Sequence, residues 1–120
     1  MIDEITDRRA DLSDAEIEGI ERTVSELLSL LGRARTMAVL REFALREEPL
    51  RFTDLQSALE CSPNTLSARL NELTTAGLLT RTAYDEMPPR VEYEPTEKAR
   101  ALFPIFARLG EWATEYDLEG

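Results

Sequence analysis

The stretch that decides the fold is SPNTLSARLNELTTAGLL, residues 62–79, which is predicted to be one helix with a defined start and end. Ser62 is a favourable N-cap, and Pro63 suits the first helical position because its missing N–H is not needed there. Gly77 suits the left-handed conformation that commonly ends a helix. Apolar residues recur on one side, which is expected to be buried: Leu66, Leu70 and Leu73.

The opposite side of this helix carries small or hydrogen-bonding residues and no long charged side chain: Asn64, Ser67, Ala68, Asn71 and Thr75. A helix surface that serves only solubility more often carries Glu and Lys. Asn and Ser can reach base edges in a DNA major groove without repelling the phosphates. Residues 63–76 are therefore predicted to read DNA; the alternative is plain helix surface.

The composition bounds the class of protein. A chain of 120 residues forms one domain by length, and an apolar fraction of 42% suffices for a core. No run approaches the roughly 18 apolar residues that a membrane span requires. The N-terminus, MIDEITDRRADL, is acidic and lacks the apolar segment of a signal peptide, so we expect a cytoplasmic protein without membrane contact.

Enzymatic and metal chemistry have little support. The chain has no histidine and one cysteine, Cys61, which excludes an internal disulfide, a His-assisted nucleophile and a zinc site built from Cys or His. Its 24 acidic residues are most simply solvated surface. We expect no enzyme, no cofactor and no metal.

Cys61 is interpreted as a small buried residue. The alternative is a redox switch, because a helix N-terminus can lower the pKa of a neighbouring thiol and so activate it.

The net charge of −10 argues against DNA binding, since DNA-binding domains are usually basic. The acidic residues are concentrated at the ends, however. Residues 1–32 hold nine acids against three arginines, whereas residues 33–100 hold eleven acids against ten basic residues. Between positions 62 and 84 there are two arginines and one glutamate. The predicted reading helix thus lies in the least acidic part of the chain.

Thirteen of the fourteen basic residues are arginine, and Lys98 is the one lysine. High acid content with Arg preferred to Lys indicates a salt-in halophile, of the haloarchaeal kind, in which acidic surfaces keep proteins dissolved in concentrated salt. The alternative is an ordinary acidic cytosolic protein.

Residues 1–12 show no period and are predicted to be a flexible tail, and residues 13–120 form a single domain. Ser13 and Glu16 make a capping box. The helix that follows has an apolar seam at spacings 3, 4, 3, 4: Ile17, Ile20, Val24, Leu27 and Leu31. Two interpretations stay open: the seam covers the domain's own core, or it pairs with a second subunit.

Two more helices lead to residue 62. The first is predicted over 35–45 and is stopped by Glu47-Glu48-Pro49. Residues 50–52 can form an edge strand. Thr53 and Gln56 then read as a capping box for a short helix to Leu59, with Leu55 and Leu59 inside. This helix, a tight turn and the helix after Ser62 make a helix-turn-helix.

After Gly77 the pattern changes to a period of two over 78–84 and 90–94, joined by Asp85-Glu86-Met87-Pro88-Pro89. A helix-turn-helix followed by this hairpin, about residues 78–95, is a winged helix. Thr96 caps a last helix, which Pro104 should kink or split. Its apolar side includes Leu102, Ile105, Leu109, Trp112 and Tyr116. The fold class is mainly α with a small β-hairpin (α+β).

From about Leu28 to Trp112 the chain resembles the HxlR family of winged helix-turn-helix transcription regulators. LLGRARTMAVLREF is similar to the family's first core helix and RFTDLQSAL to its second. SPNTLSARLNELTTAGLL is similar to the recognition helix. The most diagnostic segment, PPRVEYEPTEKARALFPIFARLGEW, resembles the wing return and the C-terminal helix almost position by position.

The resemblance implies a DNA-binding homodimer on a palindromic operator, with the N- and C-terminal helices as dimerisation helices. Two departures matter. Members that sense oxidants generally use a cysteine near the N-terminus, which this chain lacks, and Gly32-Arg33-Ala34-Arg35 replaces the usual Gly-Gly-Lys-Trp. Redox sensing is therefore not implied by the resemblance.

The candidate DNA contacts combine the helix with arginines on and beside the wing. Arg90 is preferred on the wing, because two prolines before it fix its direction, while Asp85 and Glu86 oppose a deeply inserted tip. Arg69 has an alternative role in an internal pair with Glu72 or Glu60. The candidates are Ser62, Asn64, Thr65, Ser67, Ala68, Arg69, Asn71, Arg81 and Arg90, with Arg51 and Thr53 as weaker ones. The rival function is a winged-helix module that binds protein and not DNA, which the net charge favours.

Overall fold

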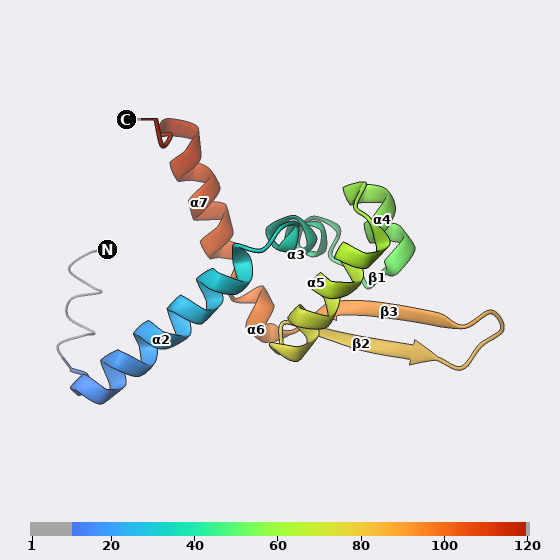
Figure 1. The fold of residues 1–120 in the computed structure, drawn as a ribbon, viewed down its shortest axis with the longest axis horizontal. Helices are drawn as coiled ribbons and strands as arrows, with labels where there is room; N and C mark the ends of the chain where they lie inside the picture. Colours follow the sequence, from blue (N-terminus) through green and yellow to red (C-terminus); the bar gives the residue numbers. More distant parts are fainter. Residues whose placement is uncertain (1–10, 120) are drawn as a thin grey trace. The chain divides into compact units, whose positions relative to one another are not determined.

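In the computed structural model, residues 11–119 are described, and the chain forms two compact units that divide after Arg33. The predicted tail of residues 1–12 falls almost wholly outside the described part. The elements, coloured along the chain in Figure 1, are α2 (Asp14–Leu31), α3 (Thr36–Arg46), β1 (Leu50–Arg51), α4 (Phe52–Leu59), α5 (Pro63–Thr75), β2 (Leu79–Tyr84), β3 (Arg90–Pro95), α6 (Glu97–Arg100) and α7 (Phe103–Glu115).

Helix α2 belongs to the first unit and begins with the predicted capping box. The Ser13 hydroxyl accepts the backbone N–H of Glu16 at 3.1 Å, and the Glu16 carboxylate accepts that of Ser13 at 3.3 Å. The helix ends at Gly32, whose N–H bonds the carbonyl of Leu28 at 2.9 Å. No residue of α2 is buried. Its apolar seam is therefore open to a partner.

The core of the second unit joins α3, α4, α5 and the sheet. The predicted inward leucines of α4 and α5 are all buried, as expected from their spacing. Burial of one such side chain contributes about 1.5–3 kcal/mol. The largest fully buried side chains are those of Thr36, Val39, Leu40, Phe43, Leu50, Leu55, Leu66, Leu70, Leu73 and Leu79.

The three strands form an antiparallel sheet in the order β1-β3-β2. Strand β1 is the predicted edge strand, with Leu50 opposite Tyr93. Strands β2 and β3 form the predicted hairpin, which runs away from α5 (Figure 1). The fold is the winged helix-turn-helix that the sequence predicted, mainly α with a small antiparallel sheet.

The predicted start of α4 is wrong. The helix begins at Phe52, and the Asp54 carboxylate accepts the backbone N–H of Arg51 at 2.9 Å, so Asp54 takes the place given to a Thr53–Gln56 box. A carboxylate in the first turn makes a charge-assisted bond and also complements the helix dipole. These effects favour the earlier start.

Helix α5 has both ends as predicted. The Ser62 hydroxyl accepts the N–H of Thr65 at 3.2 Å. At the other end Gly77 has φ 76°, in the left-handed region. Its N–H bonds the carbonyl of Thr74, and the N–H of Leu78 bonds that of Leu73. These two bonds make a Schellman motif.

The start of α6 is bonded to the end of α5. The Thr96 hydroxyl donates to the Gly77 carbonyl at 2.7 Å and accepts the N–H of Ala99 at 3.2 Å. The Lys98 ammonium donates to the Ala76 carbonyl at 2.6 Å. Two hydrogen bonds from α6 and its cap thus satisfy the carbonyls of the C-cap residue Ala76 and of Gly77, which directly follow helix α5.

The predicted split near Pro104 is confirmed, because α6 ends at Arg100 and α7 begins at Phe103. Pro104 lies in the first turn of α7, where no N–H is required. No residue of α7 is buried. Within the described residues no helix has the length and apolar character to cross a membrane.

Candidate nucleic-acid interface

The outer face of α5 is the centre of the candidate interface. The buried leucines fix the rotation of the helix and turn Asn64, Ser67 and Asn71 to the surface. Thr65 and Ala68 are half-buried on the flank. The five predicted groove-facing residues of this helix are thus accessible in different degrees, with the two asparagines and Ser67 most exposed.

The N-terminus of α5 has little free capacity to bind an anion. The Ser62 hydroxyl is engaged with Thr65, accepting its N–H and donating to its Oγ1 at 2.9 Å. Pro63 has no N–H. Among the first three helical residues, this leaves the backbone N–H of Asn64 for a phosphate oxygen.

Arg69 forms an internal ion pair with Glu72, one of the two partners predicted for such a pair. Its Nη1 lies 2.6 Å from Glu72 Oε1, and both side chains are about one-fifth to one-quarter exposed. Its Nε is buried without a hydrogen-bond partner among the described residues. A phosphate contact by Arg69 would therefore require it to share or leave the Glu72 carboxylate.

The two wing arginines project from opposite faces of the hairpin. Arg81 lies opposite Tyr93 in the ladder, and Arg90 lies opposite Tyr84. Directly opposed residues share a face and alternate residues of a strand change face. Arg90 and Tyr93 are three residues apart in β3, so their side chains lie on opposite faces of the hairpin. Because Arg81 shares the face of Tyr93, Arg81 and Arg90 lie on different sides.

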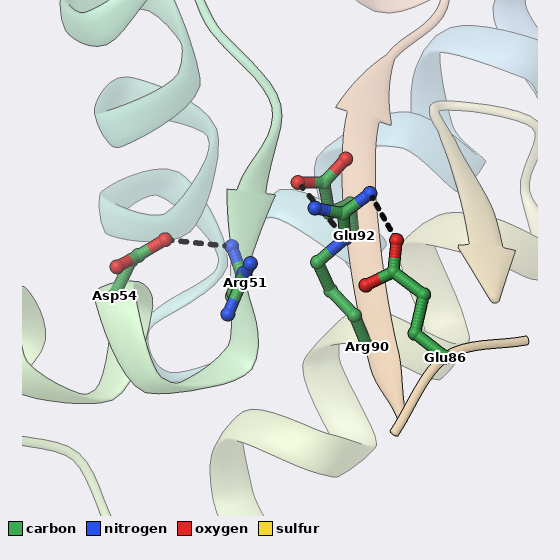
Figure 2. A network of polar contacts seen from close by, with 5 residues as sticks. All are labelled: Arg51, Asp54, Glu86, Arg90 and Glu92. Atoms are coloured by element: carbon green, nitrogen blue, oxygen red, sulfur yellow. Dashed lines mark hydrogen bonds and ion pairs between the residues drawn. The ribbon is translucent and has the colours of Figure 1, made fainter. Parts of the chain in front are cut away.

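Arg90 is held by three neighbours on its own face. Its Nη2 lies 3.3 Å from Glu86 Oε1, and its Nε lies 3.9 Å from Glu92 Oε2 (Figure 2). Its guanidinium carbon lies 4.1 Å from the centroid of the Tyr84 ring. The side chain is 28% exposed. This cluster was not predicted from the sequence, although the alternate spacing of Arg90 and Glu92 in a strand was a signal for it.

The weaker candidates lie at the other edge of the sheet. Arg51 is exposed at the end of β1, and Figure 2 shows the bond from its backbone N–H to Asp54. Thr53 is exposed in the first turn of α4.

Cys61 is buried, at 8% exposure, in the turn before α5, as expected if it is a small packing residue. A redox role for Cys61 stays a prediction.

The residues predicted for a dimer interface are partly or fully exposed on both terminal helices. On α2, Ile20 and Val24 are 49% and 48% exposed. On α7, Leu109 and Trp112 are 54% and 49% exposed. The remaining members of the predicted interface are exposed (Ile105 and Tyr116) or half-buried (Ile17, Leu27, Leu31 and Leu102).

No cluster with metal-ligand character was found in the part of the chain that the structure describes. The interface consists of amides, hydroxyls and guanidinium groups. Such groups suit hydrogen bonds to base edges and phosphates.

Comparison with known proteins gives a consistent result. A family described as HxlR-like helix-turn-helix matches residues 30–119. An HTH-type transcriptional regulator of Halalkalibacterium halodurans is 34% identical over 110 residues, covering 87% of this chain and 96% of that protein. The HTH-type regulator YvaP of Bacillus subtilis is 40% identical over 75 residues, covering 62% of this chain and 69% of that protein.

A solved structure shares the fold. The reduced form of the transcriptional regulator YodB from B. subtilis superposes with a TM-score of 0.73 at 27% identity, covering 82% of this chain and 95% of that one.

Proposed function

Because the chain belongs to the HxlR-like helix-turn-helix family of transcriptional regulators, which are not enzymes, we propose that it binds double-stranded DNA sequence-specifically as a homodimer. In this proposal α5 enters the major groove of a palindromic operator, and the wing lies on the backbone or in the minor groove. The protein acts in the cytoplasm and needs no cofactor.

The observation that carries the proposal is the exposed face of α5. This face presents Asn64, Ser67 and Asn71 and has no acidic side chain in a protein of net charge −10. An Asn amide can bond adenine bidentately, and a good bidentate contact discriminates between bases by about 1–3 kcal/mol. Ala68 can contact a thymine methyl and Thr65 a base or phosphate at the flank.

Phosphate contacts would fix the register of α5 in the groove. The N–H of Asn64 supplies one anchor at the helix start, and Arg81 supplies a charged one from the wing, while the Ser62 hydroxyl can add to these only by leaving Thr65. Arg69 and Arg90 can add to these only by sharing their carboxylate partners. The contribution of phosphate contacts to the binding free energy is therefore expected to be small for a DNA-binding protein.

Homodimerisation is supported by the two open apolar stripes, on α2 and on α7. Contiguous exposed apolar residues commonly mark an interaction site. A two-fold dimer would present two copies of α5 to two half-sites one helical turn apart, which is why a palindromic operator is expected.

The proposal is tested by selecting fragments of the host genome on the purified protein and sequencing those that are retained. We expect enriched fragments that share a palindromic motif, confirmed by gel shift at a stated salt concentration, since phosphate contacts weaken steeply as salt rises. Recovery of fragments at random, or of none, would contradict sequence-specific binding.

A second candidate function is a module that binds protein and not DNA. The net charge of −10 favours it, as do Glu86, Glu92 and Glu94 on and beside one face of the wing. The acid-free face of α5 favours DNA instead. Absence of a gel shift at low salt with every genomic fragment would decide for the protein-binding module.

A further inference from the structure

The two faces of the wing differ in charge. On the face of Arg90, the strands also carry Glu92 and Glu94, and Glu86 of the loop reaches the same guanidinium. On the face of Arg81, the neighbours are Ala83 and Val91, and neither strand contributes an acid. Strands β2 and β3 contribute one arginine to each face, and β1 adds Arg51 opposite Glu92 on the face of Arg90, but the carboxylates are all on that one side.

We infer that, given the DNA binding proposed above, the wing meets DNA through the face of Arg81, and that Arg90 is a positioning residue which fixes the wing without touching DNA. This inference assigns different roles to two arginines that look equivalent in the sequence. It also makes Arg81 the side chain that sets the phosphate contact of the wing.

The position of Arg81 supports the first half of the inference. Leu79 and Tyr93 share its face and are buried at 2% and 7% exposure, so this is the side of the sheet that packs on the helices. Helix α5 packs against β2. Arg81 is exposed two residues farther along the strand and makes no ion pair with any described residue. Its guanidinium is thus free on the side where α5 lies.

The geometry around Arg90 supports the second half. The guanidinium is stacked on Tyr84 of β2 and paired with Glu86 of the loop and Glu92 of β3. It therefore joins both strands and the connection between them. This face carries three carboxylates, of Glu86, Glu92 and Glu94, against the guanidinium groups of Arg90 and of Arg51, which lies opposite Glu92 on β1. The face is therefore net negative and repels a phosphate. A contact with DNA on this face would have to remove those carboxylates first.

The salt dependence of binding separates a phosphate contact from a positioning role. The slope of log K against log salt is negative, and loss of one phosphate contact lowers its magnitude by about 1. Loss of positioning weakens binding and leaves the slope unchanged. We expect Arg81→Ala to lower the slope by about 1 and Arg81→Lys to restore it. Arg90→Ala should weaken binding with the wild-type slope, and Arg90→Lys should not restore it, because an ammonium lacks the planar group that stacks and pairs.

A charge-matched set tests the carboxylates. Glu92→Gln removes a partner of Arg90, and Glu94→Gln removes the same charge from the same face without touching the cluster. Positioning by Arg90 predicts weaker binding for Glu92→Gln than for Glu94→Gln. If Glu92→Gln instead binds more tightly than Glu94→Gln, freeing Arg90 has helped it to reach DNA and the inference is overturned.

Amide hydrogen exchange tests the positioning role without DNA. Arg90→Ala should raise exchange in residues 82–92 and leave α5 unchanged, while Arg81→Ala should change neither. Unchanged exchange in the hairpin of Arg90→Ala, or a slope lowered by about 1 in that variant, overturns the inference. Failure of the wild-type protein to bind any DNA would instead overturn the proposed function, and the exchange result would still decide whether Arg90 fixes the wing.

Discussion

The guanidinium carbon of Arg90 lies 4.1 Å from the ring centroid of Tyr84, its direct partner across the hairpin. Tyr84 is the last residue of β2 and Arg90 the first of β3, so this contact closes the ladder where the loop leaves the sheet. A cation over an aromatic ring contributes about 0.5–1 kcal/mol at exposed sites. The wing is thus secured at its outer end by side chains and at its inner end by the core.

Replacement of Arg90 should cost measurable stability. We expect Arg90→Ala to lower the free energy of unfolding by about 1 kcal/mol, mostly through the lost ring contact, because partly solvated ion pairs contribute little. Urea denaturation measures this value. Arg81→Ala is the control on the other face and should change stability by less than about 0.5 kcal/mol. In a double-mutant cycle with Tyr84→Ala, a coupling energy near zero would show that the ring contact does not stabilise the wing.

Replacement of Asn64 should relax sequence preference. We expect Asn64→Ala to lose about 1–3 kcal/mol of discrimination at one base position per half-site, because a bidentate amide contact is lost. Competition binding with single-base variants of the selected operator measures this loss. Ser57→Ala, on the exposed side of α4, is a polar-to-alanine control outside the reading helix. Equal loss of affinity for every DNA sequence would mean that Asn64 holds the backbone and does not read a base.

Charge placed on the open stripe of α7 should separate the subunits. Leu109→Glu puts a carboxylate where an apolar contact is proposed, so we expect a shift from dimer to monomer in sedimentation equilibrium. Ala107→Glu adds the same charge to an exposed position off the stripe and should leave the dimer intact. Circular dichroism checks that both variants keep their helices. A Leu109→Glu protein that remains dimeric would place the interface elsewhere.

Potassium chloride should stabilise the folded protein well beyond simple screening. Repulsion among surface acids is already screened near 1 M salt, where the Debye length is about 3 Å. An ordinary acidic protein therefore gains little above that concentration. If the protein is halophilic, its melting temperature should continue to rise from 1 M to 3 M KCl, as measured by calorimetry. A melting temperature that stays flat or falls in this range would remove the halophilic interpretation.

Much of the fold could be predicted because local chemistry decides it. The start and end of α5 depend on Ser62, Pro63 and Gly77, and its buried side depends on three leucines at helical spacing. The break between α6 and α7 follows from Pro104. Such features act within one or two helical turns, so the sequence alone suffices to find them.

The roles of the arginines could not be predicted in the same way. Which face of the wing Arg81 occupies depends on the register between β2 and β3, and a slip of one residue would reverse it. The three neighbours of Arg90 come from two strands and a loop. The start of α4 was missed for a more local reason: Asp54 competes with Thr53 and Gln56 for the same cap, and the carboxylate is the stronger acceptor.

Lys98, the one lysine of the chain, donates from its ammonium to the Ala76 carbonyl at the end of α5. Amine-directed reagents therefore have one side-chain target, besides the N-terminal amine, and that target is attached to the reading helix. Acylation of Lys98 converts this ammonium into an amide and so removes the charged donor from the Ala76 carbonyl. One amine-directed label would thus mark and perturb the end of the reading helix, and no other side-chain amine of the chain would take it up.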